Sequence, residues 1–191
     1  MKEDRLILDK VVLGSLSRNP LHTAAWYGNA EFVNKLLQLN PMLAWVLDST
    51  DRTALHLASA RGDVDVVKVL IKAAPEMCLA GDRHCRNLVH VAALKGNVCV
   101  LKVLIEASPH AARARLDRNE TIVHLCVKLN QFESLKVLLE MMHDEEFVNA
   151  KDCEGNTILH LAVIGEHVEV RLLFLSSLIW VYLRFCFNNF I

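Results

Sequence analysis

The sequence of 191 residues lacks the features that mark several large classes of protein. Its formal net charge is only −1, so no strong overall field attracts nucleic acid or a polycationic partner. None of its six cysteines belongs to a Cys-x-x-Cys pair, and the first ten residues are too charged for the apolar core of a secretory signal. These absences predict a cytoplasmic protein with free thiols.

Motifs that carry known catalytic chemistry are also missing. The sequence has no Gly-rich phosphate loop, no His-Glu-x-x-His motif and no nucleophile elbow. One mixed cluster contains His84, Cys85, His90 and Cys99. Its spacing fits no zinc finger, and two of its members also occupy repeat positions. We therefore expect no catalytic residue, no metal site and no cofactor.

An internal repeat organises most of the chain. A five-residue motif, typified by residues 53–57, occurs five times with its histidine 34, 34, 34 and 36 residues apart. The histidines are His22, His56, His90, His124 and His160. A small residue lies two positions after each histidine, and glycine or asparagine lies six positions after the first four. Such regularity at several positions predicts a solenoid of stacked units.

Each unit is predicted to form a short helix, a turn, a longer helix and a loop. Glycine or asparagine tolerates a left-handed backbone and ends the first helix. Apolar residues 11, 14 and 15 positions after the histidine form one face of the second helix, and Pro41, Pro75 and Pro109 end it. Threonines such as Thr53 are placed to cap the first helix. We interpret the histidines as buried groups that bond a neighbouring turn.

These motifs resemble the ankyrin repeat, whose core pattern is Thr-Pro-Leu-His-x-Ala with a glycine at the end of the first helix. The resemblance covers residues 19–170 and implies an all-α ankyrin-repeat solenoid of five repeats, the fifth incomplete. The period and the Pro-x-x-Ala loops at 41–44 and 109–112 are similar to those of plant ankyrin-repeat membrane proteins with a PGG domain. That resemblance implies a signalling or defence context.

The chain departs from this plant subgroup at both ends. Residues 1–18 look like the remnant of an upstream repeat, and no PGG tripeptide or multi-span membrane domain follows the repeats. The repeat pattern fails at Arg171, where the other repeats have valine or leucine. We therefore expect an N- and C-terminally truncated member of the subgroup.

Residues 171–191 are predicted to be a hydrophobic C-terminal tail. Arg184 is the one charged residue from Leu172 to Ile191, and about 20 apolar residues in a helix span a bilayer. In one interpretation an apolar C-terminal helix anchors the solenoid on the cytosolic face of a membrane. In a second, the tail completes the fifth repeat and packs on the end of the solenoid. In a third, it is exposed, aggregation-prone sequence.

Positions that packing does not fix are the candidates for binding. The family resemblance implies that the first helices and the fingers, the loops between repeats, line a concave groove. In the first three repeats these positions carry basic residues with two aromatic residues at one end. The candidate partner-binding residues are Arg18, Trp26, Tyr27, Arg52, Arg61, Arg83, Arg86, Lys95 and Lys128.

The predicted function is a protein-binding scaffold whose partner presents an acidic surface, because arginine and large aromatic residues are enriched at interface hot spots. Two alternatives stay open. The basic positions are a solvated surface without a partner, or the chain is a membrane-anchored signalling component.

Overall fold

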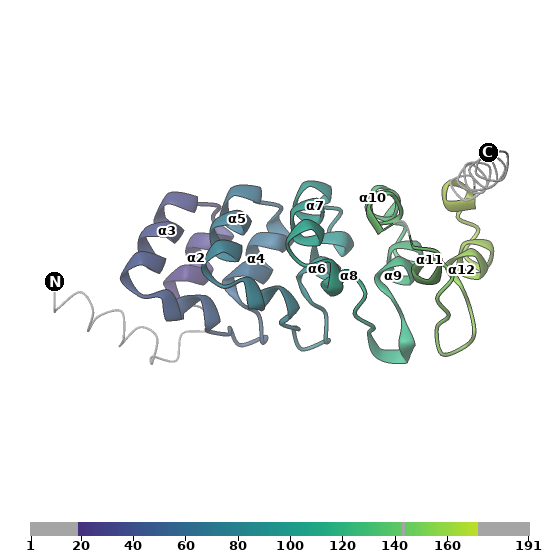
Figure 1. Ribbon diagram of the computed structural model, residues 1–191, viewed down its shortest axis with the longest axis horizontal. Helices are drawn as coiled ribbons and strands as arrows, with labels where there is room; N and C mark the ends of the chain where they lie inside the picture. Colours follow the sequence, from purple (N-terminus) through teal and green to yellow (C-terminus); the bar gives the residue numbers. More distant parts are fainter. Residues whose placement is uncertain (1–18, 143, 172–191) are drawn as a thin grey trace, which may run out of the picture. The chain divides into compact units, whose positions relative to one another are not determined.

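The computed structural model describes residues 19–142 and 144–171, and all secondary structure in these ranges is helical (Figure 1). The chain divides into two compact units, of which unit 1 ends at Ala114 and unit 2 begins at Arg115.

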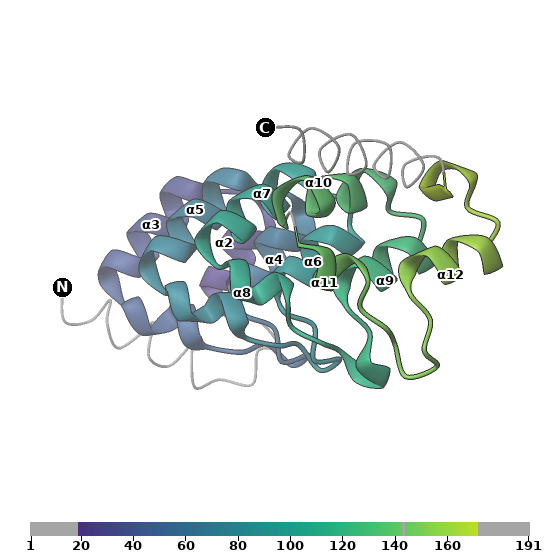
Figure 2. The same ribbon diagram turned by 45° about the vertical axis from the view of Figure 1, so that its right-hand side comes forward.

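Unit 1 contains three repeats with the same order of elements. The first helices are α2 (Pro20–Trp26), α4 (Ala54–Arg61) and α6 (Leu88–Leu94). The second helices are α3 (Ala30–Leu39), α5 (Val64–Ala73) and α7 (Val98–Ala107). Within unit 1 the first helices lie side by side in one layer and the second helices lie in another (Figures 1 and 2). The predicted alternation of a short and a longer helix is confirmed for these repeats.

The prolines that end the second helices also begin a further short helix. These helices are η1 (Pro41–Trp45), η2 (Pro75–Leu79) and α8 (Pro109–Ala112). Proline suits a first helical position because its fixed φ matches the helix and its missing N–H has no helical partner there. The sequence predicted the stop at each proline but not the short helix that follows it.

Unit 2 contains the fourth and fifth repeats. Its elements are η3 (Asp117–Asn119), α9 (Ile122–Lys128), α10 (Phe132–Met142), α11 (Glu145–Val148) and α12 (Ile158–Ile164), and residues 168–171 are also helical. Helix α9 packs against both α10 and α12. The four residues 168–171 occupy the place where a second helix begins in the other repeats.

The turn between the two helices of a repeat requires a left-handed residue. The residues six positions after the first four histidines have φ values of 74° at Gly28, 91° at Gly62, 71° at Gly96 and 52° at Asn130. Glu166 interrupts the glycine and asparagine series, yet its φ is 55°, whereas that of the adjacent Gly165 is −83°. Because this backbone region is disfavoured for glutamate, the turn of the fifth repeat does not follow from the preference of the residue type there.

Comparison of equivalent positions shows which faces stack. The residue three positions after the histidine is 0% exposed at Ala25, Ser59, Ala93 and Val127. At Val163, in the fifth repeat, it is 58% exposed. At the other end, Phe32 is 47% exposed, whereas the equivalent Val66 and Val100 are fully buried. Within a unit, the first of these positions therefore packs against the following repeat, and the second packs against the preceding one.

Candidate partner-binding face

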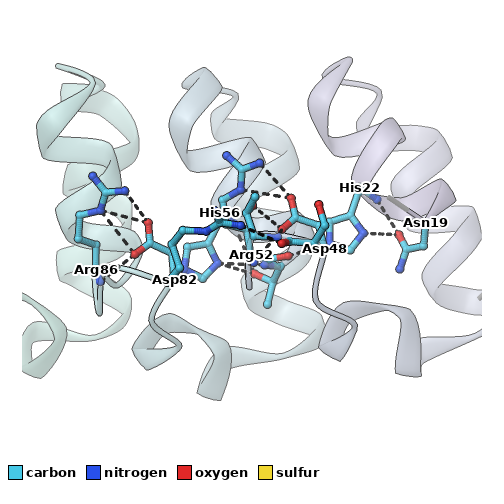
Figure 3. A network of polar contacts seen from close by, with 11 residues as sticks. Asn19, His22, Asp48, Arg52, His56, Asp82 and Arg86 are labelled. Atoms are coloured by element: carbon cyan, nitrogen blue, oxygen red, sulfur yellow. Dashed lines mark hydrogen bonds and ion pairs between the residues drawn. The ribbon is translucent and has the colours of Figure 1, made fainter. Parts of the chain in front are cut away.

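A finger is the loop that precedes a first helix, and the structure describes two of them in unit 1, at residues 48–52 and 82–86. Each contains a buried aspartate whose carboxylate accepts hydrogen bonds from the loop's own backbone. Asp48 accepts hydrogen bonds from the backbone N–H groups of Thr50 at 2.8 Å and Arg52 at 3.0 Å. It also accepts one from the Thr50 hydroxyl at 2.6 Å. The Arg52 guanidinium folds back so that its Nη2 lies 3.0 Å from Oδ2 of Asp48 (Figure 3). These bonds fix the finger from within.

The next finger repeats this arrangement. Nη2 of Arg86 lies 2.8 Å from Oδ2 of Asp82, and the Arg86 backbone N–H donates to the same carboxylate at 3.1 Å (Figure 3). In unit 2, Asp152 accepts the backbone N–H groups of Glu154 and Asn156 at 2.9 Å each. Asn156 takes the place of the arginine there, so that finger has the carboxylate without the ion pair.

The two finger carboxylates, Asp48 and Asp82, are held in their charged form. Burial alone raises the pKa of Asp48, but hydrogen bonds from Thr50 and Arg52 outweigh burial and lower this pKa from 3.8 to about 2. Burial likewise raises the pKa of Asp82, and its hydrogen bonds from Arg86 and His84 lower it overall. The positive charges of Arg52 and Arg86 are therefore compensated inside their own fingers at neutral pH.

Sequence reasoning missed this structural role of Arg52 and Arg86. The signal was present as an aspartate four residues before each arginine. Because reversing either arginine would leave a buried carboxylate beside a like charge, we expect such a change to lower stability. Whether these two arginines also contact a partner stays a prediction.

The repeat histidines connect one repeat to the next. Nε2 of His22 lies 2.9 Å from the carbonyl oxygen of Arg52, and Nε2 of His56 lies 3.1 Å from that of Ala80 (Figure 3). In unit 2, Nε2 of His124 lies 3.1 Å from the carbonyl oxygen of Asn156. The predicted bond from a buried imidazole to a neighbouring turn is confirmed at these three positions.

The other ring nitrogen of each histidine faces the residue that caps its own helix. Nδ1 of His56 accepts the Thr53 backbone N–H at 3.2 Å, and the Thr53 hydroxyl accepts the His56 backbone N–H at 3.4 Å. Thr53 therefore caps α4 as predicted, and Asn19 caps α2 in the same way. Burial lowers the pKa of His56 and of His90 to about 4, so both rings are neutral at pH 7. Across residues 19–142 and 144–171, no group of three or more His, Cys, Asp or Glu residues is placed to hold a metal ion.

Three predicted residues form a line across the first helices of unit 1, and we call Tyr27, Arg61 and Lys95 the Tyr27 row. Each lies five positions after its histidine, at the end of α2, α4 and α6 respectively. Tyr27 is 72% exposed. The side chain of Arg61 is 44% exposed, and its Nε lies 2.9 Å from Oδ2 of Asp63. Lys95 is exposed and makes no ion pair with any residue that the structure describes.

A second row lies next to the first, one residue earlier in each helix. This Trp26 row consists of Trp26, Ala60 and Leu94, all partly exposed, with Trp26 at 39%. Because the first helices stack side by side, the two rows run in parallel across three repeats. Unit 1 thus carries an apolar row beside a row of one tyrosine and two cations.

The remaining predicted residues do not join this line. Arg83 is exposed, and its Nη2 donates to the carbonyl oxygen of Ser49 in the preceding finger at 2.8 Å. Lys128 belongs to unit 2, where its Nζ lies 2.7 Å from Oε1 of Glu120. Arg18 lies outside the described residues.

This regular stack of helix pairs with tied fingers is the architecture of a repeat solenoid. A family model described as ankyrin repeats (3 copies) matches residues 4–80 and 89–179. The chain belongs to the ankyrin-repeat family, whose repeats are generally modules for protein–protein interaction. A search of curated proteins finds no match.

Apart from Arg171, residues 171–191 and the apolar C-terminal helix expected there lie outside the described residues. Among the helices that the structure does describe, none combines the length and the apolar character needed to cross a bilayer.

Proposed function

We propose that this chain is a non-catalytic scaffold that binds another protein through the Tyr27 and Trp26 rows of unit 1. The observation that carries the proposal is the exposure of Tyr27, Arg61 and Lys95 at a position of the repeat that stacking does not use. Positions that do serve stacking, such as the one at Ser59, are buried. Tyrosine, tryptophan and arginine are also the residue types most enriched at interface hot spots.

The charges of the row support an acidic partner. The side chain of Arg61 is 44% exposed although its Nε lies 2.9 Å from Oδ2 of Asp63, and Lys95 has no ion pair with a described residue. Arg83 directs its guanidinium to a carbonyl oxygen rather than to a carboxylate. A partner that brings carboxylates to these cations gains complementary contacts, which set specificity and association rate.

A cytoplasmic location is part of the proposal. Cys78, Cys85, Cys99, Cys126 and Cys153 are free thiols, and free thiols are typical of a reducing compartment. A plant signalling or defence context is the finer proposal, supported by the 34-residue period and the Pro-x-x-Ala loops.

The alternative proposal is a membrane-anchored signalling component, and it is supported by the composition of residues 172–191. Alkaline extraction of membranes from cells that express the full chain, or a chain ending at residue 171, tests it. Retention of the full chain alone, with release by detergent, supports an anchor. Release of both chains without detergent excludes one.

A peptide-display library panned on the full chain tests the binding proposal, because the protein itself selects the ligands. The selected peptides are measured against the wild type, a row variant (Tyr27→Ala with Lys95→Ala) and an outer-face variant (Lys68→Ala with Lys102→Ala). Lys68 and Lys102 are exposed on second helices, so they are matched controls. We expect the row variant to bind at least about ten-fold more weakly, because hot-spot truncations cost more than about 1–2 kcal/mol. Equal binding to all three proteins contradicts the proposal.

A further inference from the structure

We infer that the two rows of unit 1 bind a polyproline II segment that carries one apolar residue followed, at three-residue intervals, by two acidic residues. The inference rests on the proposed function and specifies the partner's chemistry. It derives from the spacing of Tyr27, Arg61 and Lys95 and from the character of the surface at each of these three positions.

The spacing comes from the stacking of the first helices. Tyr27, Arg61 and Lys95 occupy one position of the repeat on α2, α4 and α6, and α4 packs against both of the others. Packed helices are separated by about 8–10 Å, so the side chains of the row recur at about that interval. A ligand that meets all three must therefore present side chains on one face at the same interval.

Among regular peptide conformations, polyproline II matches this interval best. It has three residues per turn and a rise of about 3.1 Å, so every third side chain returns to the same face after about 9.3 Å. A β-strand returns every second side chain, after about 6.6 Å, and the fourth only after about 13 Å. In an α-helix, residues three or four apart already share a face after about 5.4 Å, and residues seven apart do so after about 10.5 Å.

The α2 end of the rows suits the apolar residue of the ligand. Trp26 and Tyr27 are consecutive and are 39% and 72% exposed, so they form an aromatic surface at the end of the first helix. Aromatic surfaces are a general means of binding polyproline II segments, which are ordered before binding and lose little entropy. The exposed Tyr27 hydroxyl can also donate to a backbone carbonyl, which polyproline II leaves without an internal partner.

The other two positions suit carboxylates. The Arg61 side chain is 44% exposed, and its guanidinium has five N–H donors, so it can meet a carboxylate of the ligand while its Nε faces Asp63. Lys95 offers an ammonium group with no carboxylate beside it in the described residues. Beside these two cations, Ala60 and Leu94 of the Trp26 row are partly exposed and apolar. The proline rings between the acidic residues of the ligand can pack on this apolar row.

Fluorescence anisotropy with synthetic peptides and the full chain tests the inference. The probes are Leu-Pro-Pro-Glu-Pro-Pro-Glu and its reversed sequence, because the rows do not fix the direction of the ligand. The comparison peptides have the same composition with glutamates two residues apart, or a helical design with seven-residue spacing. We expect one of the two probes to bind at least about ten-fold more tightly than every comparison peptide.

A charge exchange assigns the register. Lys95→Glu is expected to weaken the better probe about ten-fold, and replacing the terminal glutamate of that probe with lysine is expected to restore binding to this variant. Lys102→Glu is the matched control and should leave binding unchanged.

Four results would overturn the inference: all peptides bind equally, the seven-residue design binds more tightly, neither probe binds, or the charge exchange fails to restore binding. If library peptides still depend on Tyr27 and Lys95, the proposed function stands and only the ligand class is wrong. If they do not, the proposed function itself fails.

Discussion

Asp48 and Arg52 form an ion pair within one finger, with Oδ2 and Nη2 3.0 Å apart and the aspartate side chain only 1% exposed. The pair makes the arginine a part of the finger's own structure. Its positive charge is therefore not simply available to a partner, although its position between repeats suggested so. Arg52 therefore stabilises a finger, whereas Arg61 and Lys95 are exposed at the ends of first helices.

Asp48→Asn should destabilise the protein by roughly 2–4 kcal/mol, because one amide oxygen cannot accept every hydrogen bond that the carboxylate accepts. Arg52→Gln should cost less, because Asp48 keeps its bonds to Thr50 and to the backbone. Urea unfolding of the full chain measures both. Asp51→Asn is the matched control, since Asp51 is exposed at the finger tip and asparagine tolerates its φ of 59°. Equal costs for Asp48→Asn and Asp51→Asn would contradict the structural role of the carboxylate.

Acid should weaken the protein through the buried histidines His56 and His90. Burial lowers the pKa of His56 from 6.5 to about 4, so the neutral ring stabilises the fold fully above pH 6.5, and this contribution is lost as the pH falls toward 4. The shift corresponds to roughly 3 kcal/mol. Unfolding free energies measured between pH 7 and pH 4 should fall more steeply for the wild type than for His56→Gln. Equal slopes for the two proteins would contradict this role of His56.

The same substitution should destabilise the protein by very different amounts at equivalent positions of two repeats. Val127 is 0% exposed and Val163 is 58% exposed, although both lie three residues after a repeat histidine. Val127→Asp buries a charge without a partner and should cost roughly 3–5 kcal/mol, whereas Val163→Asp should cost less than about 1 kcal/mol. Thermal unfolding compares the two variants directly. Similar losses in both would show that the face of the fifth repeat is covered in solution.

The thiols should divide into two classes of reactivity. Cys126 is buried, and burial raises its pKa to about 12, so it should react with a thiol reagent only when the protein opens. Cys153 is exposed and should react at once in the native state. Reaction rates with a disulfide reagent, measured with and without denaturant, distinguish them. Cys153→Ser should remove one equivalent from the fast phase, and Cys126→Ser should remove none.

The repeat architecture was readable from the sequence because a single histidine register fixes many positions at once. Helix ends at Pro41 and Pro75 and the left-handed turn at Gly62 follow from backbone chemistry that those residue types dictate. The cap at Thr53 and the buried histidine at His56 follow from hydrogen bonds between near neighbours. All of these are local rules repeated along the chain.

The sequence did not predict features that depend on the path of a side chain or on contact with the next repeat. The position of Arg52 between repeats predicts an exposed cation, but the position does not show that the side chain turns back to Asp48. Glu166 takes a left-handed backbone that its residue type disfavours. His160 is exposed while the first four repeat histidines are buried, because burial at this position requires a following repeat.

The proposed binding face is tested most directly by two identical charge reversals, one on the first helix and one on the second helix of the same repeat. Lys95 lies at the end of the first helix α6, and Lys102 is exposed on the second helix α7. Titration calorimetry with one library-selected peptide compares Lys95→Glu with Lys102→Glu at equal net charge. We predict at least about ten-fold weaker binding for Lys95→Glu and wild-type affinity for Lys102→Glu. Equal affinities for the two variants would contradict the claim that the first-helix face of unit 1 is the binding surface.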